Sequence, residues 1–315
     1  MIIFLYSLNM NIGILGRTSL LLKTGNYLSN IGYKIGFVWT CKPEKFYNVG
    51  YDDFKKFAQK NNSIYLTGLN LKKNIDFIKN ANIDLCISCN WLNILPSWFL
   101  NYFKFGILNA HMGDLPKYKG NACPNWAILN FEKEIALTIH KMTTELDSGP
   151  VLSKKYYKIN DDTYIHDIYE WSEKISPGLF EKSIKAIKKK KLIPQDTRIK
   201  TLRCFPRKPE DSKLNWNNKT KSVLALIRAS SHPFEGAFCF LNNNIKKKII
   251  IYKARRFLPK YDFFAVPGQI CERNQHTIIV STNDGMIELL EFKLNNLNQI
   301  RSIAEVTKSM RNRLT

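Results

Sequence analysis

Short apolar runs alternate with amphipathic segments through the first two thirds of the chain. The apolar runs predict strands, and segments whose apolar residues recur three and four positions apart predict helices. We expect strands at residues 11–15, 34–40, 64–66, 83–89, 105–109 and 137–142, and helices at 20–31, 51–59, 74–80, 165–171 and 177–190. This alternation is typical of an α/β, Rossmann-like fold, in which a mostly parallel sheet carries helices on both faces.

The pattern changes near residue 200. Residues 194–209 are polar and include Pro194, Pro206 and Pro209, which indicates a boundary between domains at 1–200 and 201–315. Beyond it we expect one helix at 222–229 and short strands at 237–241, 248–257, 268–270, 277–281 and 287–292. Many short strands separated by turn residues predict a small β-rich, barrel-like C-terminal domain.

Composition adds a strong positive charge to this picture. The 315 residues include 48 Lys and Arg against 26 Asp and Glu, a formal net charge of +22. Such a charge is typical of proteins that bind nucleic acid or an anionic membrane surface. Because Lys is abundant along the whole chain, we favour a general compositional bias that also attracts anionic substrates, and a polyanion partner stays open.

The cysteines and the first residues indicate the compartment. Seven cysteines, odd in number and scattered, favour a reduced, cytoplasmic protein. The apolar run Met1–Leu8 is short and has no basic region before it, so we expect neither a signal peptide nor a membrane span, and Met10 is a possible true start. Cys86 and Cys89 form a CxxC without a second pair, and we interpret them as buried strand-end thiols, with no metal site.

Two glycines lie within and directly after the first predicted strand. Gly13 and Gly16 do not complete the GxGxxG pattern, so a dinucleotide fingerprint is absent. The helix that follows can hold an anion at its N-terminus. Arg17 either assists there or is a solvated residue at the helix start.

The candidate chemistry lies between residues 107 and 152. Asn109 and His111 are two residues apart at the end of a predicted strand, so their side chains project to the same side. Asp147 follows in a later loop. A carboxylate can fix the tautomer of an imidazole, and a carboxamide can donate to a developing oxyanion, so this trio suits acyl transfer to an amine. The alternative to a catalytic role is that His111 is a loop histidine that only makes structural hydrogen bonds.

The surrounding residues resemble a known family. Asn109-Ala110-His111, Leu115-Pro116-Lys117-Tyr118-Lys119-Gly120, Thr138-Ile139-His140-Lys141-Met142 and Asp147-Ser148-Gly149 stand in order. Together they resemble the signature of formyltransferases that use 10-formyltetrahydrofolate. The match spans roughly residues 85–152 and is looser elsewhere in the first half.

The resemblance implies a mechanism and a set of site residues. The substrate amine attacks the formyl carbon, Asn109 and His111 stabilise the oxyanion, and Asp147 orients His111 and completes the proton relay. His140 is interpreted as a strand histidine satisfied by a neighbour, and no metal is implied. The implied folate pocket comprises Cys89, Asn90, Trp91, Leu92, Asn93, Ile94, Leu115, Thr143 and Leu146, and the implied substrate residues are Arg17, Lys117, Tyr118, Gly120, Asn121 and Trp126.

The acceptor amine separates two branches of the family that carry a small β-rich C-terminal domain. The segment Gly120–Trp126, together with Arg207–Ser212 and Ile227–Ala229, is similar to nucleotide-sugar N-formyltransferases, including the formyltransferase half of the bifunctional aminoarabinose-modifying enzyme. We therefore expect a nucleotide-linked amino sugar as partner, in surface polysaccharide (lipopolysaccharide, O-antigen) biosynthesis. Methionyl-tRNA formylation is the alternative, and a basic nucleic-acid-binding protein with a decayed enzyme fold is an alternative of another class. A homodimer is possible by resemblance only.

Overall fold

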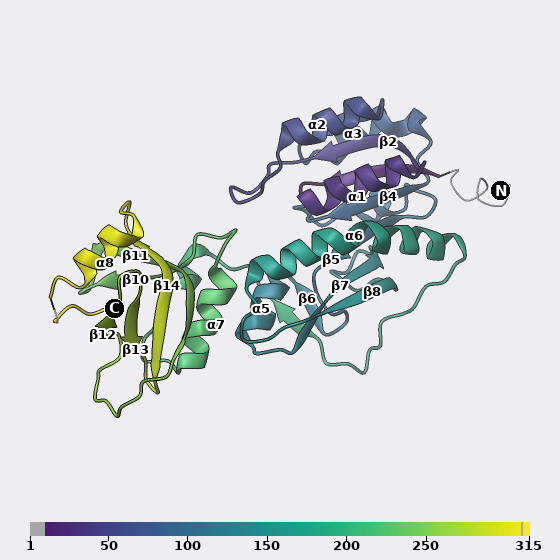
Figure 1. Ribbon diagram of the computed structural model, residues 1–315. Coiled ribbons are helices and arrows are strands. Elements are labelled where there is room, and N and C mark those ends of the chain that lie inside the picture. Colours follow the sequence, from purple (N-terminus) through teal and green to yellow (C-terminus); the bar gives the residue numbers. More distant parts are fainter. Residues whose placement is uncertain (1–9, 310) are drawn as a thin grey trace. The chain divides into compact units, whose positions relative to one another are not determined.

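The computed structural model describes residues 10–309 and 311–315, and its internal contacts divide the chain into two compact units (Figure 1). The first unit comprises the described residues up to Cys123, with Glu134–Lys158 and Tyr169–Phe205. The second comprises Pro124–Lys133, Ile159–Ile168 and Pro206–Thr315. The domain boundary near residue 200 stays a prediction, and the apolar run Met1–Leu8 lies outside the described residues.

Within the described residues, the first unit is built on a seven-stranded sheet of order β3-β2-β1-β4-β5-β7-β8. Its strands are β1 (Asn11–Gly16), β2 (Lys34–Thr40), β3 (Ile64–Thr67), β4 (Leu85–Cys89), β5 (Ile107–His111), β7 (Glu134–Lys141) and β8 (Val151–Lys158). The strands from β3 to β5 are parallel, whereas β5, β7 and β8 pair antiparallel. The expected mostly parallel sheet is confirmed.

Helices cover both faces of this sheet. On one face, α1 (Ser19–Asn30), α2 (Tyr51–Lys60) and α6 (Ile165–Lys188) share a core with Ile12 and Ile14 of β1. On the other, α3 (Leu71–Ile78) and α4 (Ser97–Leu100) share a core with Leu15 of β1. Alternate residues of one strand therefore enter opposite cores, as the period of two in a strand requires. A short 3-10 turn, η2 (Lys79–Ala81), follows α3.

The two helices expected at 165–171 and 177–190 form one helix, α6, with Pro177 inside it. Proline has no N–H to donate to the carbonyl four residues earlier. That carbonyl, of Glu173, accepts from the Ser176 hydroxyl at 3.3 Å instead. The neighbouring hydroxyl thus replaces the lost backbone bond, and the helix continues.

A two-stranded parallel pairing of β6 (Tyr118–Gly120) and β9 (Leu202–Cys204) also belongs to the first unit. It was not predicted. The pairing brings a segment from the expected linker against the LPKYKG motif, and α5 (Cys123–Leu129) begins three residues after β6.

Among the described residues, the second unit contains a five-stranded antiparallel sheet of order β10-β11-β14-β13-β12, with α7 packed on β11 (Figure 1). Its elements are η3 (Pro209–Ser212), α7 (Thr220–Ser230), β10 (Ala237–Leu241), β11 (Asn244–Phe257), β12 (Ile270–Arg273), β13 (Ile278–Ser281), β14 (Met286–Leu294) and α8 (Gln299–Val306).

The C-terminal residues join the two edges of this sheet. Leu314 bridges to Leu241 of β10, and Arg313 bridges to Gln269 just before β12. This confirms a β-rich, barrel-like domain. The strand expected at 268–270 was placed too early, because Gly268 has φ +83° and β12 begins at Ile270. Among the described residues, no helix combines the length and apolar character needed to cross a membrane.

Candidate active site

Strand β5 carries Asn109 and His111 to the site, and β7 lies beside it. The antiparallel register places His140 opposite Asn109 and Thr138 opposite His111. His111 is 7% exposed, and Asn109 is half-buried. Because residues two apart on a strand share a face, both polar side chains point the same way.

The two ring nitrogens of His111 face different groups. Nε2 lies 2.8 Å from the carbonyl oxygen of Tyr118. A carbonyl only accepts, so Nε2 carries a hydrogen and donates it. Nδ1 lies 3.6 Å from Oδ2 of Asp147, longer than a direct hydrogen bond. His111 is therefore held through Nε2 and presents Nδ1 to the carboxylate.

Asp147 is fixed from several sides. It is 9% exposed and has a left-handed backbone, with φ +49°. The Gly120 N–H donates to Oδ2 at 2.9 Å, and Gln195 Nε2 donates to the Asp147 carbonyl at 2.8 Å. The carboxylate thus reaches His111 from a rigid turn, and the structure brings the three predicted catalytic residues into one site.

His140 joins Asn109 to Asp147. Its Nε2 lies 3.3 Å from Asn109 Nδ2 and 3.7 Å from Asp147 Oδ1, while Nδ1 lies 3.2 Å from the Lys141 carbonyl. Burial, with the charge of His111 second, lowers the pKa of His140 to about 4. A neutral ring that donates from Nδ1 accepts at Nε2, so the Asn109 amide points one N–H at His140. As predicted, this strand histidine is satisfied by its neighbours.

Gly113 is a site residue that the sequence reasoning missed. A Cβ at this position would lie 2.2 Å from His111 Nε2 and 2.4 Å from the Tyr118 carbonyl oxygen. No side chain fits there, so the hydrogen bond that holds His111 depends on glycine. The only sequence signal is its place between His111 and the LPKYKG motif.

The predicted folate residues after β4 form a partly exposed loop. Cys89 is buried at the strand end, and burial raises the pKa of its thiol to about 11. Cys86 is buried too, so the interpretation of this CxxC as strand-end thiols is confirmed. Asn90 has φ +53°, and Asn93 is exposed. Leu92 and Ile94 are 44% and 73% exposed, which leaves apolar surface beside the strand end.

Arg17 lies under this loop. Its side chain is buried, donates from Nε to the Asn90 carbonyl at 3.1 Å and pairs with Glu44 at 2.8 Å. The alternative of a solvated helix-start residue is wrong. Trp91 packs edge-on against Trp39 at 5.8 Å between ring centroids, and its indole N–H is buried with no hydrogen-bond partner in the described part of the chain.

Of the remaining predicted residues, some are buried, some are exposed, and one belongs to the second unit. Leu115 is buried, whereas Thr143, Leu146 and Asn121 are exposed. Tyr118 is buried, supplies the carbonyl that holds His111, and lies with its ring 5.4 Å from the Lys117 ammonium. Trp126 belongs to the second unit, where the Arg207 guanidinium lies 5.9 Å from its ring centroid.

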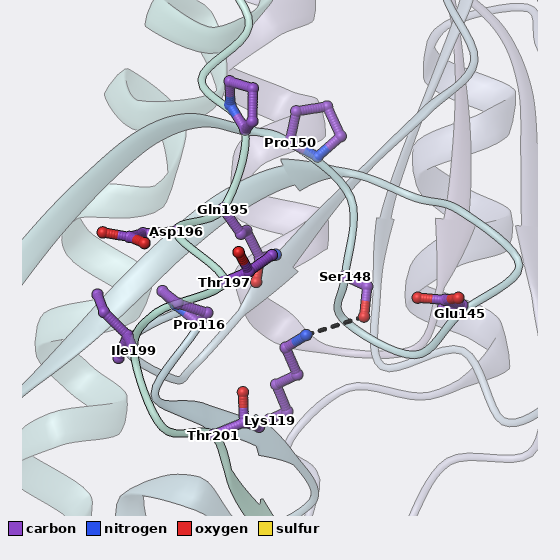
Figure 2. Close-up of a pocket in the computed structure, with 11 residues that line it drawn as sticks. Pro116, Lys119, Glu145, Ser148, Pro150, Gln195, Asp196, Thr197, Ile199 and Thr201 are labelled. Atoms are coloured by element: carbon purple, nitrogen blue, oxygen red, sulfur yellow. Dashed lines mark hydrogen bonds between the residues drawn. The ribbon is translucent and has the colours of Figure 1, made fainter.

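A cavity of about 510 Å³ is lined in part by Ser148, the residue that follows Asp147 in the chain (Figure 2). Its lining includes Pro116, Lys119, Ser148, Gln195 and Thr201, none of them predicted as site residues. Figure 2 shows the Lys119 ammonium pointing at the Ser148 hydroxyl, which accepts at 2.8 Å. The Gln195 Oε1 is buried without a hydrogen-bond partner among the described residues. The lining also holds the carboxylates of Glu145 and Asp196, and together with one cation, hydroxyls and an unused acceptor it suits a polar ligand.

The sequence matches known families and proteins. The formyl transferase model matches residues 48–180, and the formyl transferase C-terminal domain model matches residues 207–308. The bifunctional polymyxin resistance protein ArnA of Wigglesworthia glossinidia brevipalpis is 29% identical over 247 residues, 78% of this chain but 36% of that protein. A methionyl-tRNA formyltransferase of Clostridium tetani is 30% identical over 217 residues, 68% of each chain.

A solved structure shares the fold. The N-formyltransferase from Helicobacter canadensis, in complex with folinic acid and dTDP-3-aminofucose, superposes with a TM-score of 0.64 at 19% identity and covers 90% of this chain and 100% of that one. The chain belongs to the formyl transferase family and is an enzyme of formyl group transfer.

Proposed function

We propose that the protein transfers a formyl group from 10-formyltetrahydrofolate to the amino group of a nucleotide-linked amino sugar. The observation that carries this proposal is the arrangement of His111, held through Nε2 by a carbonyl with Nδ1 3.6 Å from Asp147 Oδ2. The co-substrate supplies the formyl carbon and the N10 leaving group. The acceptor amine forms the new C–N bond, and the bond to N10 breaks.

Asn109 and His140 act together on the developing oxyanion. The neutral His140 ring accepts from one N–H of the Asn109 amide at 3.3 Å, which leaves the second N–H to donate to the formyl oxygen. A fixed donor of this kind stabilises charge that develops in the transition state. His140 is a positioning residue in this account, because it acts through Asn109.

His111 and Asp147 transfer the protons of the reaction. The amine loses a proton as it attacks, and N10 needs one as it leaves. His111 Nδ1 and the Asp147 carboxylate share that proton, and the Gly120 N–H at 2.9 Å keeps Oδ2 in place. Because Asp147 is 9% exposed, little water competes for the proton.

The loop Cys89–Ile94 and the turn Thr143–Leu146 hold the folate. The exposed side chains of Leu92 and Ile94 offer apolar contact to a flat ring, and the Trp91 indole N–H, buried without a partner among the described residues, offers a donor. Both features fit a pterin, which needs apolar walls and a few fixed hydrogen bonds.

The acceptor occupies the cavity lined in part by Ser148. A volume of about 510 Å³ suits part of a small ligand rather than a folded nucleic acid. Lys119 faces a phosphate, and Gln195 Oε1 accepts from a sugar hydroxyl or amine. The Asn125-Trp126 sequence and the resemblance to the aminoarabinose-modifying enzyme support a sugar. In the Helicobacter canadensis structure the ligand is an amino sugar linked to dTDP.

Methionyl-tRNA formylation is the second candidate. It is favoured by the 30% identity to the Clostridium tetani enzyme and by the net charge of +22. Under the sugar proposal the protein works in the cytoplasm, on precursors of surface polysaccharides such as O-antigen. A homodimer belongs to the same proposal.

An acceptor panel tests the choice. The purified protein is incubated with 10-formyltetrahydrofolate and UDP-, GDP- or dTDP-linked amino sugars, beside methionyl-tRNA. Mass spectrometry should detect a gain of ~28 Da, the CO added by formylation, in at least one nucleotide sugar. The rate of formylation of that sugar should be far above the rate of formylation of the tRNA. Formylation of the tRNA alone would overturn the sugar proposal.

A further inference from the structure

One cysteine contacts His111 on its Nε2 side, and a second lies beside the turn that carries the first. Cys123, at the start of α5, has its Sγ 3.8 Å from His111 Nε2 and 3.5 Å from the Gly120 carbonyl. Cys204 ends β9, where the ladder pairs it with Gly120. The Asn121 N–H donates to the Cys204 carbonyl at 3.0 Å, so Cys204 lies beside the Gly120–Cys123 turn, where each thiol affects the pKa of the other. A pair of cysteines far apart in the sequence therefore meets at the turn that contacts the catalytic histidine.

The two thiols differ in acidity. The hydrogen bond from Cys123 lowers the pKa of Cys204, and the charge of Arg203 acts in the same direction. The same hydrogen bond, with burial second, raises the pKa of Cys123. Cys204 is also the more accessible of the two, at 6% exposed against 1% for Cys123. Thiolates are the reactive form of cysteine, so Cys204 is the nucleophile of the pair.

We propose that Cys123 and Cys204 are a redox modification site, oxidised by peroxide to a reversible disulfide that slows formyl transfer. The Cys204 thiolate attacks one oxygen of hydrogen peroxide and, with one proton taken up, gives a sulfenic acid and water. The Cys123 thiol then attacks the Cys204 sulfur, its proton leaves with the hydroxyl as a second water, and the S–S bond forms. Two thiols are oxidised and one peroxide is reduced.

The disulfide acts on the site through the Gly120–Cys123 turn. Gly120 donates to Asp147 Oδ2 at 2.9 Å, and Cys123 contacts His111. An S–S bond of about 2.05 Å is shorter than any contact between unbonded sulfurs, so Cys123, Cys204 or both must move to form it, and either movement shifts the Gly120–Cys123 turn. The movement displaces one or both members of the His111–Asp147 pair. This effect on rate rests on the proposed function, whereas disulfide formation does not.

The test uses the full chain, reduced and then treated with hydrogen peroxide. After alkylation of free thiols and proteolysis, mass spectrometry should find a peptide pair joined through Cys123 and Cys204. The formyl transfer rate should fall roughly tenfold or more, as expected for a small displacement of catalytic groups, and return with dithiothreitol. Cys204→Ser should keep the reduced rate, form no cross-link and resist peroxide.

Cys271→Ser is the matched control. Cys271 is the least buried of the seven cysteines and lies in the second unit, so its loss should leave both cross-link and inhibition intact. Peroxide that oxidises Cys271 but never joins Cys123 to Cys204 would overturn the proposal, as would a cross-linked protein with an unchanged rate. If no acceptor is formylated, the proposed function fails, and the cross-link still decides whether the redox site exists. Cys204→Ala replaces Cys204→Ser if the serine variant does not fold.

Discussion

Gly113 is the position where one added carbon should disturb the site most. In Gly113→Ala the new Cβ would lie 2.2 Å from His111 Nε2 and 2.4 Å from the Tyr118 carbonyl oxygen, against roughly 3.5–4 Å for an ordinary contact. The imidazole, the carbonyl or both must move by about 1 Å or more. The atoms displaced are the two ends of the hydrogen bond that holds His111.

A displacement of this size should cost about 10²-fold in kcat, or roughly 2.7 kcal/mol of transition-state stabilisation. The assay is the initial rate of tetrahydrofolate release with saturating donor and acceptor. Folate affinity should change little, because the atoms nearest to the new Cβ belong to His111 and Tyr118 and none of them to the loop Cys89–Ile94. Far-UV circular dichroism establishes that the variant is folded.

Gly178→Ala is the control for the added methyl group. Gly178 lies in α6, and a Cβ there meets nothing within 4 Å. It should keep the wild-type rate and gain up to about 1 kcal/mol of stability from helix propensity. A folded Gly113→Ala variant with the kcat of the wild type would refute the reasoning, since His111 would then work without its contact to Tyr118.

Three further outcomes are expected. Asp147→Asn keeps an acceptor for the Gly120 N–H but loses the charge facing His111, so kcat should fall by about 10²–10⁴-fold; an active variant would remove Asp147 from the proton relay. His140 has a folded pKa of about 4, below the value near 6.5 of an unfolded histidine. The unfolded state therefore binds more protons than the folded state between these two pH values. The free energy of unfolding, measured in urea, should reach its highest value above about pH 6.5 and decrease as the pH falls towards 4. The slope should shrink in His140→Asn, and an equal slope in both proteins would contradict the assignment. Lys119→Met should raise the KM of the acceptor about tenfold with little change in kcat, and an unchanged KM would place the acceptor elsewhere.

The sequence predicted the features that repeat or lie close along the chain. The alternation of strands and helices identified the parallel part of the sheet, and the N-x-H spacing placed Asn109 and His111 on one strand face. The segment 194–209 was expected to be a linker, but Leu202–Cys204 of it pairs with Tyr118–Gly120. Strands of three residues are too short to show a period of two, and their pairing partner is far away in the sequence.

The same limit explains the site residues that were missed. Gln195 reaches the Asp147 carbonyl from that segment, and the contact of Cys204 with Cys123 depends on the β6–β9 pairing. Gly113 matters because two atoms approach it in space, which no local pattern reveals. His140 was correctly expected to be satisfied by neighbours, but its role depends on the register that sets it opposite Asn109.

The most direct test of the account is the formyl transfer rate of His111→Ala beside its affinity for the folate. His111 contacts Asp147 and Tyr118 but lies outside the predicted folate loop, so the account predicts a loss of several orders of magnitude in kcat with folate binding within a few-fold of wild type. A His111→Ala variant that turns over at a near-normal rate would contradict the central claim.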